Sequence, residues 1–235
     1  LTLSGSGTCI DAGVLTGQGG GTPTGGVYSG PGVTDDGNGM TYSFDPAAAG
    51  VGVHTITYSY SEPNGCGAAM ATADFEVFAL PTVTFTAPDD LCVDDAVQMN
   101  LSGGMPAQGT AMGDAGVYSG PGVTDNGDGT YDFDPNAAGV GTHTITYTYT
   151  DENGCTSSAS DDVEVSLAPE VTLSTAPYYC VDAPIDNAPI TGGSPAGGVY
   201  SGPGVTDAGD GMSYSLDPNV NGPGTITITY TVTVG

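Results

Sequence analysis

Positive charge is absent from this sequence: it has no lysine and no arginine, against 27 aspartates and glutamates, so its formal net charge is −27. Nucleic acids and anionic membrane surfaces attract proteins through cationic side chains, and neither is therefore expected as a partner. Such a charge needs screening by mobile cations, which suits a saline or calcium-rich medium. The composition thus predicts a well-solvated acidic surface.

Long apolar runs and helical periodicity are also missing. No run approaches the roughly 18–20 residues of a membrane helix, so membrane insertion is not expected. Instead, residues 143–150 read HTITYTYT, with His, Ile and Tyr facing one way and Thr the other. Segments 54–61 and 225–232 alternate in the same way. This pattern of β-branched and aromatic residues predicts half-buried antiparallel strands.

The sequence does contain a threefold repeat. The nonapeptide VYSGPGVTD occurs at 27–35, 117–125 and 199–207. A Cys-x-Asp triplet precedes each copy, and an Asp-Pro pair and an ITITYT-like segment follow it. One small domain per repeat is expected, with the ranges 1–79, 80–168 and 169–235.

Each repeat is predicted to be an Ig-like antiparallel β-sandwich of roughly seven short strands, so the fold class is all-β with three tandem sandwich domains. Pro81 and Pro169 mark the junctions, and linkers this short predict an elongated rod. The third repeat is expected to be C-terminally incomplete, because the counterpart of strand 157–165 is missing from it.

The nonapeptide itself is predicted to form a strand, a turn and a strand. Proline fits the second position of a type II turn, and glycine fits the third, where φ is positive. The turn residues are Pro31, Gly32, Pro121, Gly122, Pro203 and Gly204. This structural interpretation is favoured over a binding site displayed three times.

A second turn motif follows each nonapeptide. Asp45-Pro46 with Gly50 predicts one helical turn that has an aspartate N-cap and crosses between the sheets. The segments 134–139 and 217–222 repeat it.

Five cysteines indicate an oxidising, extracellular location. No CxxC pair or Cys/His cluster indicates zinc instead. Pairing within each repeat, Cys9 with Cys66 and Cys92 with Cys155, closes loops of similar length, each contributing roughly 4 kcal/mol in the chain-entropy model. Cys180 is then expected to pair with a cysteine about three residues beyond Gly235.

Residues suited to catalysis are scarce. The two histidines, His54 and His143, correspond to Ile226 in the third repeat, and a catalytic or metal-binding residue would not be replaced by isoleucine. The usual nucleophile–base pairs are missing, and the carboxylates recur per repeat in no recognisable acid–base arrangement. We therefore expect structural histidines, no catalytic residues and no enzymatic activity.

Calcium is the one candidate cofactor. A glycine-rich loop with hard oxygen donors, which suit Ca²⁺, follows each nonapeptide. Its candidate ligands are Asp35, Asn38, Asp125, Asp128, Asp207 and Asp210. The alternative is a plain hairpin, because Asp-Gly and Asn-Gly are common hairpin turns and the loop lacks the length and closing glutamate of an EF-hand.

Segments 133–155 and 192–205, with the leading Cys-Val-Asp triplets, resemble Ig-like repeats in very large secreted proteins of Bacteroidota. Those proteins are typically exported by the type IX secretion route and act as surface adhesins, gliding-associated filaments or other extracellular structures. The resemblance covers essentially the whole chain and implies an Ig-like fold, a cell-surface role and no catalytic residues. The third repeat departs from the pattern by lacking the Asn-Gly-Cys ending, and the absence of Lys and Arg is extreme even for such repeats.

Three functions follow as hypotheses. The favoured one is a non-catalytic structural or adhesive segment of an extracellular surface filament or stalk, whose partners are neighbouring repeats or copies of the same protein. A calcium-dependent module that binds surface glycans is the second. The third is a self-assembling filament subunit, completed by strand exchange with a neighbouring chain.

Overall fold

The computed structural model describes residues 7–62, 67–175, 179–181, 186–220 and 222–233. Strands dominate these residues and the helical segments are one turn long, so the chain is all-β, as predicted. The chain divides into two compact units, Leu1–Ser166 and Leu167–Gly235. The first unit holds the first two repeats, each with its own hydrophobic core, and the second unit holds the third.

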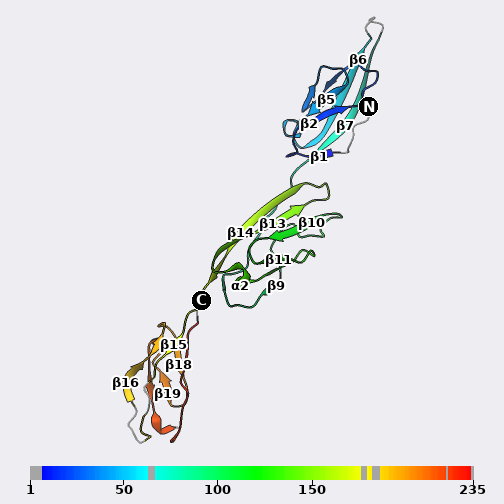
Figure 1. Ribbon diagram of the computed structural model, residues 1–235. Helices are drawn as coiled ribbons and strands as arrows, with labels where there is room; N and C mark the ends of the chain where they lie inside the picture. The colour runs from blue at the N-terminus through cyan, green and yellow to red at the C-terminus, as the bar shows by residue number, and fades with distance from the viewer. Residues whose placement is uncertain (1–6, 63–66, 176–178, 182–185, 221, 234–235) are drawn as a thin grey trace. The chain divides into compact units, whose positions relative to one another are not determined.

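In its described residues, the first repeat is a sandwich of two sheets with seven strands, which Figure 1 shows with the strand labels. The four-stranded sheet has the order β1 (Gly7–Cys9), β7 (Ala68–Phe78), β6 (Gly52–Ser61) and β3 (Val27–Ser29). The three-stranded sheet has the order β2 (Leu15–Gly19), β5 (Thr41–Phe44) and β4 (Val33–Asp35). Neighbouring strands are antiparallel, except that β1 runs parallel to β7 with Cys9 opposite Phe78. Four strands facing three is the arrangement of an Ig-like sandwich.

The second repeat has the same two sheets. The four-stranded sheet has the order β10 (Ala115–Ser119), β13 (Gly141–Thr150), β14 (Thr156–Ser166) and β8 (Leu91–Cys92). The three-stranded sheet has the order β11 (Val123–Asp125), β12 (Tyr131–Phe133) and β9 (Gln98–Leu101). Strand β8 runs parallel to β14, as β1 does to β7, so the position of each leading cysteine is the same.

The third repeat keeps part of this plan. Its three-stranded sheet has the order β16 (Asp186–Thr191), β20 (Ser213–Leu216) and β19 (Val205–Asp207). Two strand pairs accompany it: β18 (Val199–Ser201) with β21 (Thr229–Thr231), and β15 (Thr172–Leu173) with β17 (Gly193–Ser194). The alternation over 225–232 predicts a longer strand than β21. Among the described residues only β18 pairs with this segment, and it covers Thr229–Thr231 alone.

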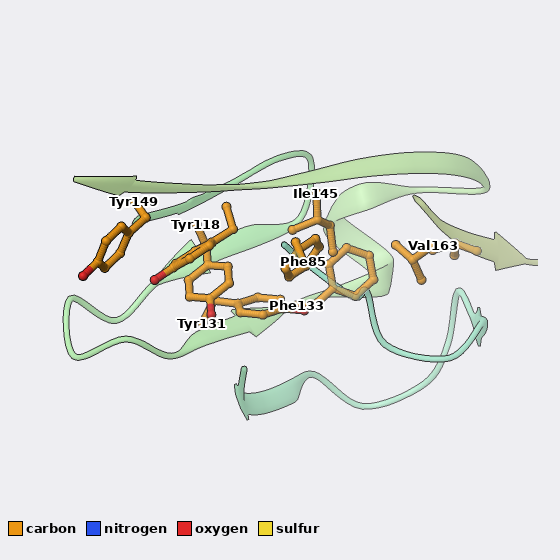
Figure 2. Close-up of a cluster of buried hydrophobic side chains, with 9 residues drawn as sticks. Phe85, Tyr118, Tyr131, Phe133, Ile145, Tyr149 and Val163 are labelled. Carbon is orange, nitrogen blue, oxygen red and sulfur yellow. The ribbon is translucent and has the colours of Figure 1, made fainter. Parts of the chain in front are cut away.

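Three tyrosines whose rings pack against one another form the centre of each core. In the second repeat the ring centroid of Tyr118 lies 4.5 Å from that of Tyr131 and 4.6 Å from that of Tyr147. Figure 2 shows Tyr118, Tyr131 and Phe133 packed together inside the second repeat. Burial raises the pKa of Tyr131 and of Tyr147 to about 12, so both phenols remain neutral over the physiological range. The matching trios are Tyr28, Tyr42 and Tyr58, and Tyr200, Tyr214 and Tyr230.

The repeated nonapeptide closes on itself. Val33 donates its N–H to the carbonyl of Gly30 at 3.2 Å, and Gly32 has φ +69°, the left-handed value that the third turn position requires. Asp35 Oδ1 accepts the N–H of Tyr28 at 2.9 Å, which joins the last residue of the nonapeptide to its second. The other copies form the same turn and aspartate bond, with Gly122, Asp125, Gly204 and Asp207 in the matching places. This repeated hydrogen-bond pattern gives the segment a structural reason to recur.

The Asp-Pro motifs form single turns that pack on the nonapeptide. The helices α1 (Pro46–Ala49) and α2 (Pro135–Ala138) occur where they are predicted, each capped by the preceding aspartate. The third repeat has the 3₁₀ turn η1 (Pro218–Val220) instead. Asp45 donates its N–H to the carbonyl of Gly32 at 2.8 Å, and both other repeats make the equivalent bond.

Candidate functional site

A disulfide joins the first repeat to the second. Cys9, the last residue of β1, is bonded to Cys155, the residue before β14, with the Cα atoms 5.5 Å apart. The side chain of Cys155 is buried. Cys92 is a partly buried free thiol, and Cys180 is an exposed one.

This bond corrects the predicted pairing of Cys9 with Cys66 and of Cys92 with Cys155, and the strand register gives the reason. Cys92 lies opposite Ser166, the last residue of β14, whereas Cys155 directly precedes the first. A strand of that length spans roughly 30–35 Å at about 3.3 Å per residue, whereas bonded cysteines have Cα atoms about 4.4–6.8 Å apart. Cys92 and Cys155 therefore lie at opposite ends of the second sandwich. Cys66 itself lies outside the described residues.

The loop that carries Cys155 is held by one carboxylate. Asp151 Oδ1 accepts the N–H of Asn153 at 2.9 Å and that of Cys155 at 2.8 Å. Its carbonyl accepts the N–H of Gly154, which has φ +84°. These bonds fix the backbone of the hairpin loop, so the sulfur of Cys155 is presented in a defined position.

The interrepeat bond can be tested by cutting the linker. A site-specific protease sequence inserted after Ala79 should yield two halves that stay together without reductant and separate with dithiothreitol, because Cys9 and Cys155 lie on opposite sides of the cut. Replacing Cys155 with serine should change the non-reducing result from complete retention to complete separation. Non-reducing electrophoresis reads both outcomes.

Cys92→Ser is the matched control for that experiment and should leave the halves joined, because Cys92 is free. Halves of the parent chain that separate without reductant would contradict the structure and would support pairing within each repeat.

The six residues predicted as calcium ligands accept hydrogen bonds from backbone N–H groups of their own repeat. Asp35 accepts N–H groups of Tyr28 and Gly37, and Asp207 accepts the matching pair. Asp125 accepts from Tyr118, while Asn38, Asp128 and Asp210 each accept backbone N–H groups two or three residues onward. Among the residues that the structure describes, no three His, Cys, Asp or Glu side chains gather around a common point. Calcium binding by these loops stays a prediction.

A further carboxylate organises a loop that has no counterpart in the other repeats. Asp114 accepts the N–H groups of Gly109, Thr110 and Ala111 at 2.8–3.0 Å and the hydroxyl of Tyr149 at 2.9 Å. The hydrogen bond from Ala111, followed by those from the other donors, lowers the pKa of Asp114 to about 2. Sequence comparison between the repeats had no means of finding this residue.

The loop around Asp114 should be sensitive to acid. Because the pKa of this carboxyl is lowered by folding, the stabilisation is complete above its ordinary value of about 4 and is lost as the pH falls towards about 2. The backbone amide signals of residues 109–111 should therefore shift with a midpoint near pH 2 in an NMR titration. Asp114→Asn should abolish that transition while leaving the signals of the Asp151 loop unchanged, and a midpoint near pH 4 would contradict the assignment.

The histidines contact the helical turns. His54 Nε2 lies 2.6 Å from the carbonyl of Gly50, and His143 Nε2 lies 2.7 Å from that of Gly139. Ile226, at the matching place, packs against the core of the third repeat. The two histidines thus link β6 and β13 to the preceding helical turns.

A hollow of about 720 Å³ lies in the third repeat, and the apolar side chains of Ile226 and Ile228 form part of its lining. In the first repeat, Phe75 of β7 lies opposite His54, the residue that matches Ile226; in the second, Val163 of β14 lies opposite His143. Both Phe75 and Val163 are buried. Within the described residues of the third repeat, no strand lies opposite Ile226.

No protein-family model and no curated protein sequence matches the chain. Solved structures are similar to it in fold. The fibronectin(III)-like modules of CbhA from Clostridium thermocellum align over 71% of this chain and 93% of theirs, with 14% identity and a TM-score of 0.36. A Ca²⁺-stabilized adhesin by which an Antarctic bacterium binds ice aligns over 94% of this chain and 68% of its own, with 17% identity and a TM-score of 0.36.

The protocadherin GammaB4 extracellular domain aligns over 92% of this chain and 43% of its own, with 16% identity and a TM-score of 0.33. These values describe a likeness of fold and nothing more. Among the described residues, none of the helical segments is long or apolar enough to cross a membrane.

Proposed function

We propose that this chain is a structural and adhesive segment of an extracellular stalk or surface filament, with no catalytic role. The observation that carries the proposal is the disulfide between the first and second repeats, because a covalent bond between successive domains limits their relative motion. Disulfides persist in oxidising environments, which agrees with a cell-surface location. The resemblance to repeats of secreted Bacteroidota adhesins and gliding filaments supports the same role.

The roles found for the recurring residues also favour a structural protein. The nonapeptide turns, the aspartates that end the nonapeptides and Asp45, which caps an Asp-Pro turn, all form hydrogen bonds with the backbone of their own repeat. These residues then recur because each repeat needs them to fold. The partners of such a segment are neighbouring repeats and other copies of the same protein.

The test separates a stalk from a glycan-binding module. The full chain is applied to an array of surface glycans, once with calcium and once with a chelator. In a second measurement, pulsed electron paramagnetic resonance gives the distance between spin labels on the first two repeats. A stalk should show no chelator-sensitive glycan binding and a narrow distance distribution that broadens after reduction. Chelator-sensitive binding together with a broad distribution in the oxidised chain would overturn the proposal in favour of a calcium-dependent lectin.

A second candidate, the addition of a strand from another chain to the third repeat, is favoured by the hollow beside Ile226. A peptide with the sequence 156–166 should bind the full chain and slow hydrogen exchange of residues 225–228. The peptide has the sequence of β14, which pairs with β13, the strand of the second repeat that matches this segment. The same peptide with both valines replaced by serine is the matched control. Equal exchange with either peptide would exclude strand addition.

A further inference from the structure

Cys92 has the same local structure as the bonded Cys9. Each ends a short strand that runs parallel to the last strand of its repeat, with Cys9 opposite Phe78 and Cys92 opposite Ser166. The next residue donates its N–H to that opposite carbonyl, at 2.9 Å for Ile10 and at 2.8 Å for Val93. The carbonyl of each cysteine accepts an N–H from three residues onward, at 3.1 Å in both. The two thiols therefore lie at structurally equivalent positions in their repeats.

The disulfide at Cys9 shows which kind of partner a cysteine at this position bonds to. Its partner is the cysteine of an Asn-Gly-Cys hairpin loop in the following repeat, held by Asp151. Cys92 is partly buried and free, although it occupies the equivalent position. It cannot take the hairpin cysteine of its own repeat, because Cys155 lies at the other end of β14 and is already bonded.

We propose that Cys92 forms a second interrepeat disulfide. Its partner is the cysteine of an Asn-Gly-Cys hairpin loop in the next repeat along a chain of such repeats. Each leading cysteine then bonds to the hairpin of its successor, and a row of repeats is linked covalently at every junction. This arrangement also assigns Cys180 a partner outside its own repeat.

The bond forms by ordinary thiol oxidation. The S–H bonds of Cys92 and of the hairpin cysteine break, one Sγ–Sγ bond forms, and two protons and two electrons pass to an oxidant. A small-molecule disulfide such as oxidised glutathione suffices, because its own S–S bond is reduced to two thiols in exchange. The inference extends the proposed stalk, yet its test reads only the pairing of cysteines, so a failure of adhesion would leave it standing.

The experiment adds to the third repeat a hairpin taken from the second. In the variant, the sequence of residues 151–166 follows Thr233, which places one added cysteine where the repeat pattern puts it. The full chain is refolded with oxidised and reduced glutathione, free thiols are alkylated, and disulfide-linked peptides are mapped by mass spectrometry. The added cysteine should be linked to Cys92, whose alkylation falls from complete to near zero, while Cys180 remains alkylated.

Single replacements distinguish the possible partners. Cys180→Ser should retain the new bond, and Cys92→Ser should abolish it. The bond between Cys9 and Cys155, measured in the same sample, reports that folding and oxidation succeeded. An added cysteine linked to Cys180, or left free while Cys9–Cys155 forms, would overturn the proposal.

If the extended chain does not fold, a peptide takes the place of the grafted hairpin. The parent chain is treated with a peptide of residues 147–161 whose cysteine carries a thionitrobenzoate leaving group. Exchange should be faster at Cys92 than at exposed Cys180, and faster than with a scrambled peptide. Equal rates, or a faster reaction at Cys180, would count against specific recognition of the hairpin at Cys92.

Discussion

Replacing Tyr147 with alanine is expected to lower the free energy of unfolding of the second repeat by about 3–5 kcal/mol, the range for removing a large buried aromatic side chain. Tyr147 is fully buried, and its ring packs so closely on Gly104 and Gly116 that a Cβ built on either glycine would lie 2.3 Å from a side-chain atom of the tyrosine. Its hydroxyl donates to the carbonyl of Pro106 at 2.7 Å. Urea unfolding followed by circular dichroism gives the difference.

Two phenylalanine variants separate the ring from the hydroxyl. Tyr147→Phe should cost about 1 kcal/mol, because it removes the hydrogen bond and leaves the ring. Tyr131→Phe should be neutral or slightly stabilising, since the buried hydroxyl of Tyr131 has no hydrogen-bond partner among the described residues. If Tyr147→Ala cost no more than Tyr147→Phe, the ring would not be filling the core.

Replacing Gly122 with alanine should destabilise the second repeat by about 2–5 kcal/mol. The residue has φ +72°, and a left-handed conformation costs other residues about 1–2 kcal/mol. A Cβ at this position would also lie 2.6 Å from the carbonyl oxygen of Asp134 and 2.8 Å from the Cβ of Ala138. Overpacking of that kind typically adds about 1–3 kcal/mol.

Gly127→Ala is the matched control for the turn. Gly127 has φ +74°, nearly the same backbone strain, but nothing lies within 4 Å of the position that a Cβ would take there. It should therefore show only the strain, about 1–2 kcal/mol, in the same unfolding experiment. Equal losses for the two variants would mean that the nonapeptide turn is not held against α2.

Much of the fold follows from residues whose effect is local. The alternation of 143–150 places β13, and Pro121 with Gly122 places the turn, since each depends on the backbone preferences of a few neighbours. The Asp-Pro turns follow in the same way from an N-cap and a fixed φ.

The disulfide could not be predicted on those terms. Repetition shows which cysteines correspond, but pairing within a repeat and pairing with the next repeat preserve the same periodicity. The parallel register of β8 on β14 determines which pairing is possible, and it is a contact between residues more than 70 positions apart in sequence. The Asp151 loop does carry a local signal, an aspartate two residues before Asn-Gly-Cys. Asp114 has none, because the other repeats lack its loop.

The bond between Cys9 and Cys155 also determines how the first two repeats respond to a pulling force. Tension applied beyond the two cysteines passes directly through the sulfur atoms, so the residues between them carry almost none of it. With the bond open, the 146-residue separation could lengthen to roughly 480–530 Å at full extension, taking about 3.3–3.6 Å per residue. With it closed, that length is not released even where heat or denaturant unfolds both cores. Under tension, these two repeats therefore act as a link of nearly constant length.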